Sequence, residues 1–331
     1  MNVGYLFKDI SKSVSGKHTV GQCINLLKYK LSKKTIILNY DPLSLSIAAT
    51  DRCNFQCYMC QTHSKNIGDF PFKHKPCKDM DFDLFKKIID KFRNATSVSI
   101  VGTGEPLLNK DLFRMIKYAK NVRKMKVTTV SNGSFDLHLI DKILTSGLDS
   151  ISISLNGHNS NEFERMTKMD KKFEVIVNNI KLLVERRNML KINLNISCSF
   201  IVDQINYKNI PDMLKISTKL GIDHANFGNF LPSPFPGFTL EERCLTNNNK
   251  EAINFLSQLN ISKYPLIVRL PQVLDISGKW RLCESHFTTL RVDGDGNIGG
   301  CGTMLLNLKA HIFNRVIRLK LCEKFQKLLI F

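Results

Sequence analysis

Three cysteines, Cys53, Cys57 and Cys60, lie within eight residues of one another in the stretch TDRCNFQCYMCQTH at residues 50–63. All three follow the first predicted strand, so their thiolates can converge on one inorganic centre. A structural zinc ion takes four ligands, usually from two separated CxxC-type pairs, and no such second pair follows this loop. Three thiolates suit a cubane of four irons and four sulfurs, because one iron then stays open to an outside ligand. Without a metal the trio would be an oxidation hazard, so we predict a cluster here.

Two further segments end predicted strands and carry groups that can contact a ligand. VGTGEP at residues 101–106 contains glycines that let the backbone approach a ligand, and its carbonyls and Glu105 can accept hydrogen bonds from an ammonium group. SNG at residues 131–133 offers the short side chains of Ser131 and Asn132 to ribose hydroxyls or to a carboxylate. Each segment also has a purely structural interpretation, the first as a turn before Pro106 and the second as a helix cap.

A regular alternation of predicted strands and helices positions these loops. Strands separated by helical patterns favour parallel pairing with right-handed crossovers. The predicted fold class is α/β, either a partial (β/α)6 TIM-like barrel, which we favour, or an open doubly wound sheet. In both folds the chemistry lies beyond the carboxyl ends of the strands. Strands are predicted at residues 43–50, 96–102, 125–130, 149–155, 191–202 and 222–231, and helices at 81–92, 110–120, 135–147, 173–187 and 210–221.

The rhythm changes after about residue 240, and we predict a smaller α+β unit there. Residues 247–260 have a helical pattern, residues 264–271 an extended one, and residues 287–302 a hairpin around the turn Gly294-Asp295-Gly296. Near the N-terminus, GQCINLLKYKLSKK predicts a basic amphipathic helix, either a cap or a surface- or membrane-adjacent element. The predicted division is an N-terminal cap at residues 1–42, a core at 43–240 and a C-terminal region at 241–331.

The cysteine loop resembles the CxxxCxxC signature of the radical S-adenosylmethionine (radical SAM) superfamily, which commonly has an aromatic residue at the position of Tyr58. The resemblance covers most of the chain beyond residue 40. It implies that the three cysteines hold a [4Fe-4S] cluster whose open iron is chelated by the amino and carboxylate groups of S-adenosylmethionine. An electron from the cluster then splits the sulfonium into methionine and a 5'-deoxyadenosyl radical. Cluster potentials span roughly −700 to +450 mV and this cleavage needs the low end, so an external low-potential electron donor is implied.

The resemblance also implies roles for residues around the cluster. Tyr58 would pack near the cluster and the adenine, and residues 102–105 resemble the glycine-glycine-glutamate motif of the superfamily, although Thr103 replaces its second glycine. Arg165 would pair the cofactor carboxylate, or it is a solvated arginine at the start of a helix. The predicted cofactor-binding residues are Tyr58, Gly102, Thr103, Gly104, Glu105, Ser131, Asn132, Ser154 and Arg165.

A spaced cysteine pair near the C-terminus, Cys283 and Cys301, resembles the start of the SPASM and twitch domains, which hold auxiliary iron-sulfur clusters. The predicted hairpin would bring both sulfurs to one metal. The family has a further cysteine group downstream, whereas this chain offers only Cys322. Three interpretations stay open: a truncated or frameshifted chain, which we favour; a second cluster completed by Cys322 and a non-cysteine ligand; or two cysteines left from a lost site.

Composition narrows the class of protein. The chain has 331 residues, 43% of them apolar, which is enough for a large core with an appendage, and no apolar run approaches the roughly 18 residues that cross a bilayer. We therefore expect a cytoplasmic protein whose thiols are free or bound to metal. The 48 Lys and Arg against 29 Asp and Glu give a formal charge of +19, which suits a nucleic-acid partner. These residues are spread along the chain, so we favour a general compositional bias.

We expect a radical SAM oxidoreductase or maturase that abstracts hydrogen from an unactivated carbon of a peptide or of a sugar- or cyclitol-like molecule, as in the SPASM and twitch branch. Candidate substrate contacts are Asn226, Asn229 and the segment LPSPFPGF at residues 231–238, for which packing is an equal explanation. An RNA methyltransferase is one alternative, because the RNA-adenine-methylating branch shares a Gly-x-Gly-Glu-Pro-Leu-Leu-Asn run. A cluster- or zinc-binding module without turnover is the other.

Overall fold

Nine strands form one sheet in the structure, which is a computed structural model. It describes residues 18–32, 38–60, 62–65, 78–231, 243–277 and 284–299. The strands are β1 (Ser44–Ala48), β2 (Ser97–Val101), β3 (Lys126–Ser131), β4 (Ser150–Ser154), β5 (Asn195–Val202), β6 (His224–Asn229), β7 (Ile267–Arg269), β8 (Thr289–Val292) and β9 (Ile298–Gly299).

Helices connect most of these strands. The α-helices are α2 (Val20–Leu31), α3 (Phe82–Lys91), α4 (Leu112–Lys117), α5 (Leu139–Thr145), α6 (Ser160–Thr167), α7 (Phe173–Met189), α8 (Ile210–Leu220), α10 (Lys250–Gln258) and α11 (Ser285–Thr288). Short 3-10 helices are η1 (Pro106–Leu108), η3 (Tyr207–Asn209) and η4 (Ile261–Lys263), and α4 continues as a π-helix, η2 (Tyr118–Val122).

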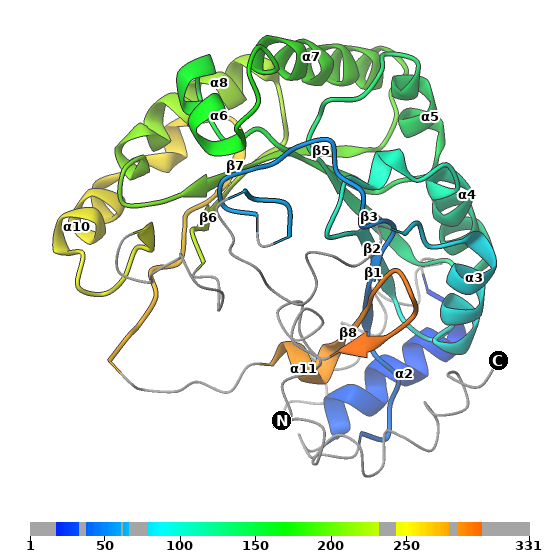
Figure 1. Cartoon of the computed structure of the whole chain (residues 1–331). Coiled ribbons are helices and arrows are strands. Elements are labelled where there is room, and N and C mark those ends of the chain that lie inside the picture. Colours follow the sequence, from blue (N-terminus) through cyan, green and yellow to red (C-terminus); the bar gives the residue numbers. More distant parts are fainter. Residues whose placement is uncertain are drawn as a thin grey trace.

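The strands are ordered β7-β6-β5-β4-β3-β2-β1-β8-β9 across the sheet. All neighbours from β7 to β8 are parallel, whereas β8 and β9 are antiparallel. In Figure 1 the sheet curves into an open arc, and the helices from α3 to α8 follow one another along its outer side. The predicted α/β class with a partial TIM-like barrel is confirmed, and among the described residues the barrel is not closed.

Local signals explain where several elements begin and end. The side chain of Asp81 caps α3 by accepting a hydrogen bond from the backbone N–H of Leu84 at 2.7 Å. Helix α3 then buries Phe85 and Ile88 against the sheet. Gly221 ends α8 in the left-handed conformation, with a φ of 67°, as the sequence predicts.

Side chains alternate between the two faces of each strand. On β1, Leu45 and Ile47 are fully buried and belong to the core that includes the helices, whereas Ser44 and Ser46 are half-buried. Strands β2 and β4 repeat this pattern, with aliphatic residues in the core and serines between them. The core therefore lies between the sheet and the outer helices, and the concave inner face carries small polar side chains.

The region after residue 240 contributes to the same sheet. Strand β7 extends it beside β6, and β8 pairs in parallel with β1 at its other side. The predicted hairpin is present: β8 and β9 flank a turn in which the N–H of Asp293 donates to the carbonyl of Asn297 at 2.9 Å and Gly296 has a φ of 86°. The domain boundary at residue 240 stays a prediction, because residues 300–331 lie outside the described part of the chain.

The predicted N-terminal helix is α2, and buried amides hold it against the core. The side chain of Gln22 donates to the carbonyls of Ala95 and Arg123 at 2.9 and 3.0 Å. Asn25 donates to the carbonyl of Asp41 at 3.0 Å. These bonds tie α2 to the segments around Ala95, Arg123 and Asp41, and the cap at residues 1–42 stays a prediction. No helix of the described residues is long and apolar enough to cross a membrane.

The two asparagines of β6 predicted as substrate contacts face opposite sides of the sheet. Asn229 is 8% exposed, and its amide donates to the carbonyls of Leu245 and Gln272 at 2.7 and 2.9 Å while accepting from the N–H of Leu245 at 2.9 Å. Asn226 lies half-buried on the inner face, and its amide makes no hydrogen bond with the described residues. Asn229 therefore has a structural role, and Asn226 stays a candidate contact.

We predict that Asn229→Ala lowers the free energy of unfolding by about 2 kcal/mol or more, because it leaves buried backbone groups without partners. The matched variant Asn226→Ala should change it by less than about 0.5 kcal/mol. Denaturant titration of both variants measures the difference. Equal losses in the two variants would contradict the assignment of the two faces.

Candidate active site

The cysteine loop leaves β1 at the carboxyl edge of the sheet and is tied to the chain segment around Asp79. The guanidinium of Arg52 donates to the carboxylate of Asp79 in a two-pronged pair, at 2.9 and 2.6 Å. It also donates to the carbonyl of Leu108 at 2.7 Å, and the hydroxyl of Thr50 donates to Asp79 at 2.6 Å. The start of the loop is therefore fixed from two sides.

The end of β2 lies directly against this loop. The N–H groups of Gly104 and Glu105 donate to the carbonyls of Thr50 and Arg52 at 3.1 and 2.8 Å. A Cβ atom on Gly104 would lie 2.1 Å from the carbonyl oxygen of Arg52, and one on Gly102 would lie 2.6 Å from that of Thr50. The close approach predicted for these glycines exists, and its partner in the structure is the backbone of the cysteine loop.

Thr103, the departure from the glycine-glycine-glutamate motif, makes one side-chain contact that a glycine could not make and one backbone contact that it could. Its hydroxyl donates to the carboxylate of Asp51 at 2.5 Å. Its carbonyl accepts from the hydroxyl of Thr62 at 3.1 Å, and that hydroxyl lies 3.2 Å from the sulfur of Cys60. Thr103 thus connects the β2 end to both ends of the cysteine loop.

Glu105 joins the ends of β2 and β3. Its carboxylate accepts from the N–H of Asn132 at 2.6 Å and from the N–H of Leu107 at 3.1 Å, and only 4% of the residue is exposed. Burial raises the pKa of this carboxyl above its usual value. Each oxygen already has a backbone partner, so contact with the cofactor ammonium stays a prediction.

The predicted polar residues at the ends of β3 and β4 differ in position. The amide of Asn132 donates to the side chain of Asn54 at 2.7 Å and so reaches the cysteine loop. Ser131 is buried, and its hydroxyl accepts from the N–H of Gly133 at 3.0 Å. Ser154 is half-buried on the inner face, 3.4 Å from the hydroxyl of Ser199. Asn132 and Ser154 are thus the better placed of the three for a ligand.

Tyr58 is held over the end of α6. Its N–H donates to the carbonyl of Met166 at 2.8 Å, and its ring packs near Phe230 with ring centroids 6.3 Å apart. The guanidinium of Arg243 and the ammonium of Lys168 lie 4.9 and 5.6 Å from the ring centroid. This side of the cysteine loop therefore carries cations above an aromatic ring.

Arg165 lies in the last turn of α6, rather than at the start of a helix. Its guanidinium pairs with the fully buried carboxylate of Asp203 at 3.2 Å, and Arg243 pairs with the same carboxylate at 3.4 Å. One nitrogen of Arg165 is buried without a hydrogen bond and lies 4.0 Å from a carboxylate oxygen of Glu162. The guanidinium is thus held between two carboxylates of the chain, and its pairing with the cofactor carboxylate stays a prediction.

The three cysteine side chains fit a cubane better than a single ion. All three are free and half-buried. Burial, with a smaller contribution from the neighbouring thiols, raises the pKa of Cys53 to about 11 and that of Cys57 to about 12, so a metal must displace their protons. The described residues contain no group of three or more His, Cys, Asp or Glu side chains that could hold one metal ion. A cubane has no need of such a group, since each thiolate ligates a different iron.

Backbone donors already point at two of the sulfurs. The N–H of Phe55 donates to the sulfur of Cys53 at 3.4 Å, and the N–H of His63 donates to that of Cys60 at 3.3 Å. Such hydrogen bonds stabilise thiolates and tune the potential of a bound cluster. The predicted auxiliary ligands Cys283 and Cys301 lie outside the described residues.

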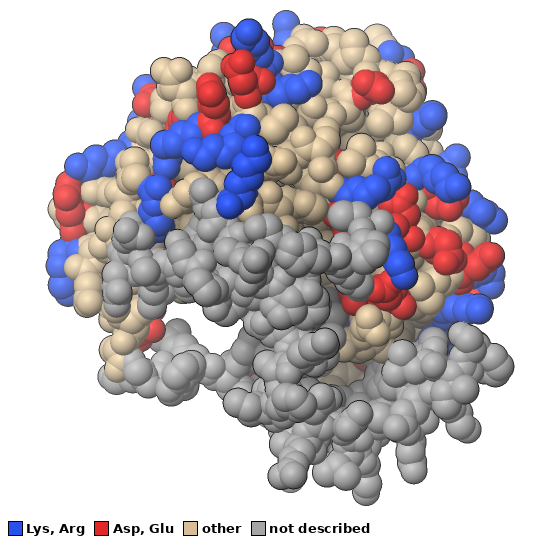
Figure 2. Space-filling model, in the orientation of Figure 1, with Lys and Arg blue, Asp and Glu red and all other residues tan. Residues whose placement is uncertain are grey.

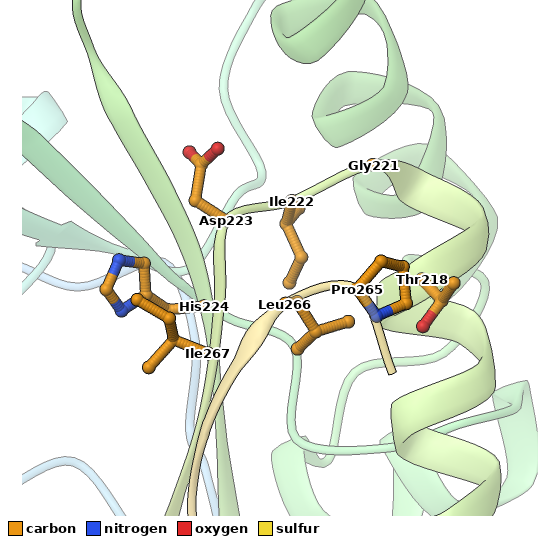
Figure 3. A pocket seen from close by; sticks show the side chains of 8 residues that line it. All are labelled: Thr218, Gly221, Ile222, Asp223, His224, Pro265, Leu266 and Ile267. Carbon is orange, nitrogen blue, oxygen red and sulfur yellow. The ribbon is translucent and has the colours of Figure 1, made fainter. Parts of the chain in front are cut away.

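A hollow at the opposite edge of the sheet is unrelated to this chemistry. It lies where α8 ends and β6 and β7 begin, as Figure 3 shows. Mostly apolar groups line it, including Ile222, Pro265 and Leu266. The cysteine loop follows the carboxyl end of β1, whereas this hollow is at the amino ends of β6 and β7.

The predicted site residues include Ser154 but leave out four other serines of the inner face. Ser46, Ser99, Ser152 and Ser199 all lie at positions that alternate with core residues. The signal was available, since LSLSI, SVSI, SISIS and SCS place serine at every second position of four strands.

We predict that Gly104→Ala displaces the cysteine loop, because its Cβ would overlap the carbonyl of Arg52. The free energy of unfolding should fall by about 2 kcal/mol, and iron bound per chain after reconstitution should fall severalfold. Gly228→Ala is the matched control, since its Cβ would come no closer than 3.4 Å to the side chain of Ile201. If Gly104→Ala kept the iron content and the stability of the wild type, the tight backbone contact between the cysteine loop and the end of β2 would be refuted.

Comparison with known proteins places these residues in a family. A model of the Radical SAM superfamily matches residues 47–215, more than half of the chain. The chain is 28% identical over 179 residues to a probable GTP 3',8-cyclase of Methanocaldococcus jannaschii, covering 54% of this chain and 56% of that protein. A probable GTP 3',8-cyclase of Saccharolobus solfataricus is 26% identical over 219 residues, covering 66% of each. The chain thus spans less than two thirds of the length of these curated relatives.

Solved structures share the fold. SuiB of Streptococcus suis bound to S-adenosylmethionine has a TM-score of 0.62 at 15% identity, covering 86% of this chain and 64% of that one. The structure of anSMEcpe with bound AdoMet has a TM-score of 0.57 at 16% identity, covering 86% of this chain and 77% of that one. At these identities the likeness shows the fold alone. Because the family match includes the cysteine loop and the strand ends that hold it, the chain belongs to the radical SAM superfamily and uses a [4Fe-4S] cluster and S-adenosylmethionine.

Proposed function

We propose that this chain cleaves S-adenosylmethionine reductively and abstracts a hydrogen atom from an unactivated carbon of a polar small molecule. The proposal rests on the position of the cysteine loop. Backbone hydrogen bonds to the end of β2 hold this loop at the carboxyl edge of a parallel sheet, and its three thiols are free and lie beside the concave face. Ligands of such sheets bind beyond the carboxyl ends of the strands. The radical would therefore form next to the inner face.

The residues have distinct roles in this proposal. Cys53, Cys57 and Cys60 hold the cluster, which supplies the electron that breaks the cofactor's sulfonium bond. The backbone donors of Phe55 and His63 stabilise two of the thiolates. Around the cofactor, Asn132, Ser154 and Arg165 offer a neutral amide, a hydroxyl and a guanidinium. Tyr58 closes the side of the site next to the cations Arg243 and Lys168.

The class of substrate is the finer part of the proposal. The sequence relatives named above are called probable GTP 3',8-cyclases, and they support a nucleotide. Solved structures of SuiB with the precursor peptide SuiA and of anSMEcpe with the peptide Cp18Cys support the peptide expectation, although only through the fold. The SPASM and twitch assignment stays a proposal. We favour a nucleotide, because the sequence matches have the higher identity.

An RNA substrate is the weaker candidate. Figure 2 shows acidic side chains interspersed with basic ones over the described part of this face, so the basic charge is not gathered into one continuous patch there. Several cations are paired, for example Arg123 with Asp90 at 2.7 Å and Lys120 with Asp149 at 2.5 Å. The distribution supports a compositional bias more than a nucleic-acid footprint.

We predict that Cys57→Ala loses the cluster and with it all reductant-dependent formation of 5'-deoxyadenosine. The control is Cys23→Ala, because Cys23 is a half-buried thiol on α2, away from the loop. Iron and sulfide analysis with chromatographic detection of 5'-deoxyadenosine measures both effects. A Cys57→Ala protein that keeps its full brown chromophore would remove the ligand assignment, and zinc without iron in the wild type would favour the binding-module alternative.

We predict about four irons and four sulfides per chain after anaerobic reconstitution, the content of one cubane. Cys301→Ala should leave this content unchanged. About eight irons in the wild type, falling to about four in Cys301→Ala, would instead establish the auxiliary cluster at Cys283 and Cys301.

A further inference from the structure

The inner face of the sheet is lined by small hydrogen-bonding side chains in register across several strands. Closed barrels of this kind fill their interior with bulky branched residues. Here most inward positions are polar instead. One row is Arg291, Ser46, Ser99, Thr128, Ser150 and Asn195, and another is Val130, Ser152, Ser197, His224 and Ile267, in which only the two ends are apolar.

A third row reaches the carboxyl ends of β4 and β7, whereas on β5 and β6 one more inward pair, Ile201 and Gly228, follows it. Its members, in the order of the strands, are Ser154, Ser199, Asn226 and Arg269. Figure 3 shows the orientation of the strands at the β6–β7 side: His224 and Ile267 project together from one face, while Ile222 and Leu266 project toward α8. Arg269 follows Ile267 by two residues and so shares its face. Val268, between them, packs on the core.

The last two members of this row have their polar groups unused. The hydroxyls of Ser154 and Ser199 contact each other at 3.4 Å. Asn226 and the exposed Arg269, by contrast, make no hydrogen bond or ion pair with the residues that the structure describes. Arg165 and Arg243, in contrast, share the buried carboxylate of Asp203, which directly follows β5. Arg269 is therefore a cation free to pair with a ligand.

The row runs from the cofactor side to the open edge of the sheet. Ser154 is predicted to contact the cofactor, and strands lie about 4.8 Å apart, so Arg269 is roughly 14 Å farther along the row. A guanidinium pairs with two oxygens of a phosphate, and an amide both donates and accepts. A substrate lying along the row would present its reacting carbon near the cofactor and an oxyanion at the far end.

We propose that Asn226 and Arg269 position the substrate, and that this substrate is a hydroxylated small molecule carrying a phosphate. This inference rests on the proposed function, since it places the radical beside Ser154. Ser199 and Asn226 hydrogen-bond the uncharged part, and Arg269 pairs with the phosphate. Both residues are positioning groups, since neither lies at the cluster.

Binding to the reconstituted full chain with S-adenosylmethionine and without reductant tests the inference. The probes are GTP, guanosine and triglutamate, measured by equilibrium dialysis. We expect the wild type to bind GTP more tightly than guanosine, and Arg269→Gln to weaken GTP binding about tenfold or more while leaving guanosine unchanged. Arg269→Lys should recover part of the lost GTP affinity, and Asn226→Ala should weaken the binding of both GTP and guanosine severalfold. Arg93→Gln, an exposed arginine that follows α3, is the matched control.

Several outcomes would overturn the inference. These are equal GTP affinity in Arg269→Gln and Arg93→Gln, equal affinity of the wild type for GTP and guanosine, absence of GTP binding, or Arg269-dependent binding of triglutamate alone. Iron content confirms that each variant keeps its cluster. Formation of 5'-deoxyadenosine is measured separately, so a protein that forms it without Arg269-dependent binding keeps the proposed function and loses this inference.

Discussion

The contact between the backbone of the cysteine loop and the backbone at the end of β2 is the constraint on which the site depends. Two N–H groups of the β2 end donate to two carbonyls of the loop, and no side chain fits between the two segments at Gly104. A loop without regular structure needs contacts of this kind to define its path. This backbone contact therefore fixes the positions of the three sulfurs relative to the end of β2.

Polar side chains extend this constraint to the rest of the carboxyl edge. Glu105 holds the start of the β3 loop, Asn132 reaches from there to Asn54 in the cysteine loop, and Tyr58 is bonded to the end of α6. A buried carboxylate such as that of Glu105 is costly unless its partners are in place. The bonds that satisfy it also hold the ends of β2 and β3 together, so stability and site geometry share residues here.

The sequence predicts the strands, the parallel order and the cluster ligands, because these depend on local periodicity and on spacing. It does not predict which asparagine of β6 has a structural role. That Asn229 lies on the core side and Asn226 on the concave inner face depends on the register of β6. Nor does it predict that β7 and β8 join the core sheet, because pairing of Ser46 with Arg291 links residues far apart in sequence. The function of Thr103 was likewise hidden, since its partner Asp51 belongs to another segment.

The two faces of the sheet carry different information. The outer face is aliphatic and packs on helices, so many sequences satisfy it, which is consistent with a TM-score of 0.62 to SuiB at 15% identity. The inner face is free of that demand, and its polar residues contribute little to the packed core. Selection for a substrate can therefore act on the inner rows without loss of the fold. For this reason the fold alone cannot decide between a peptide and a nucleotide.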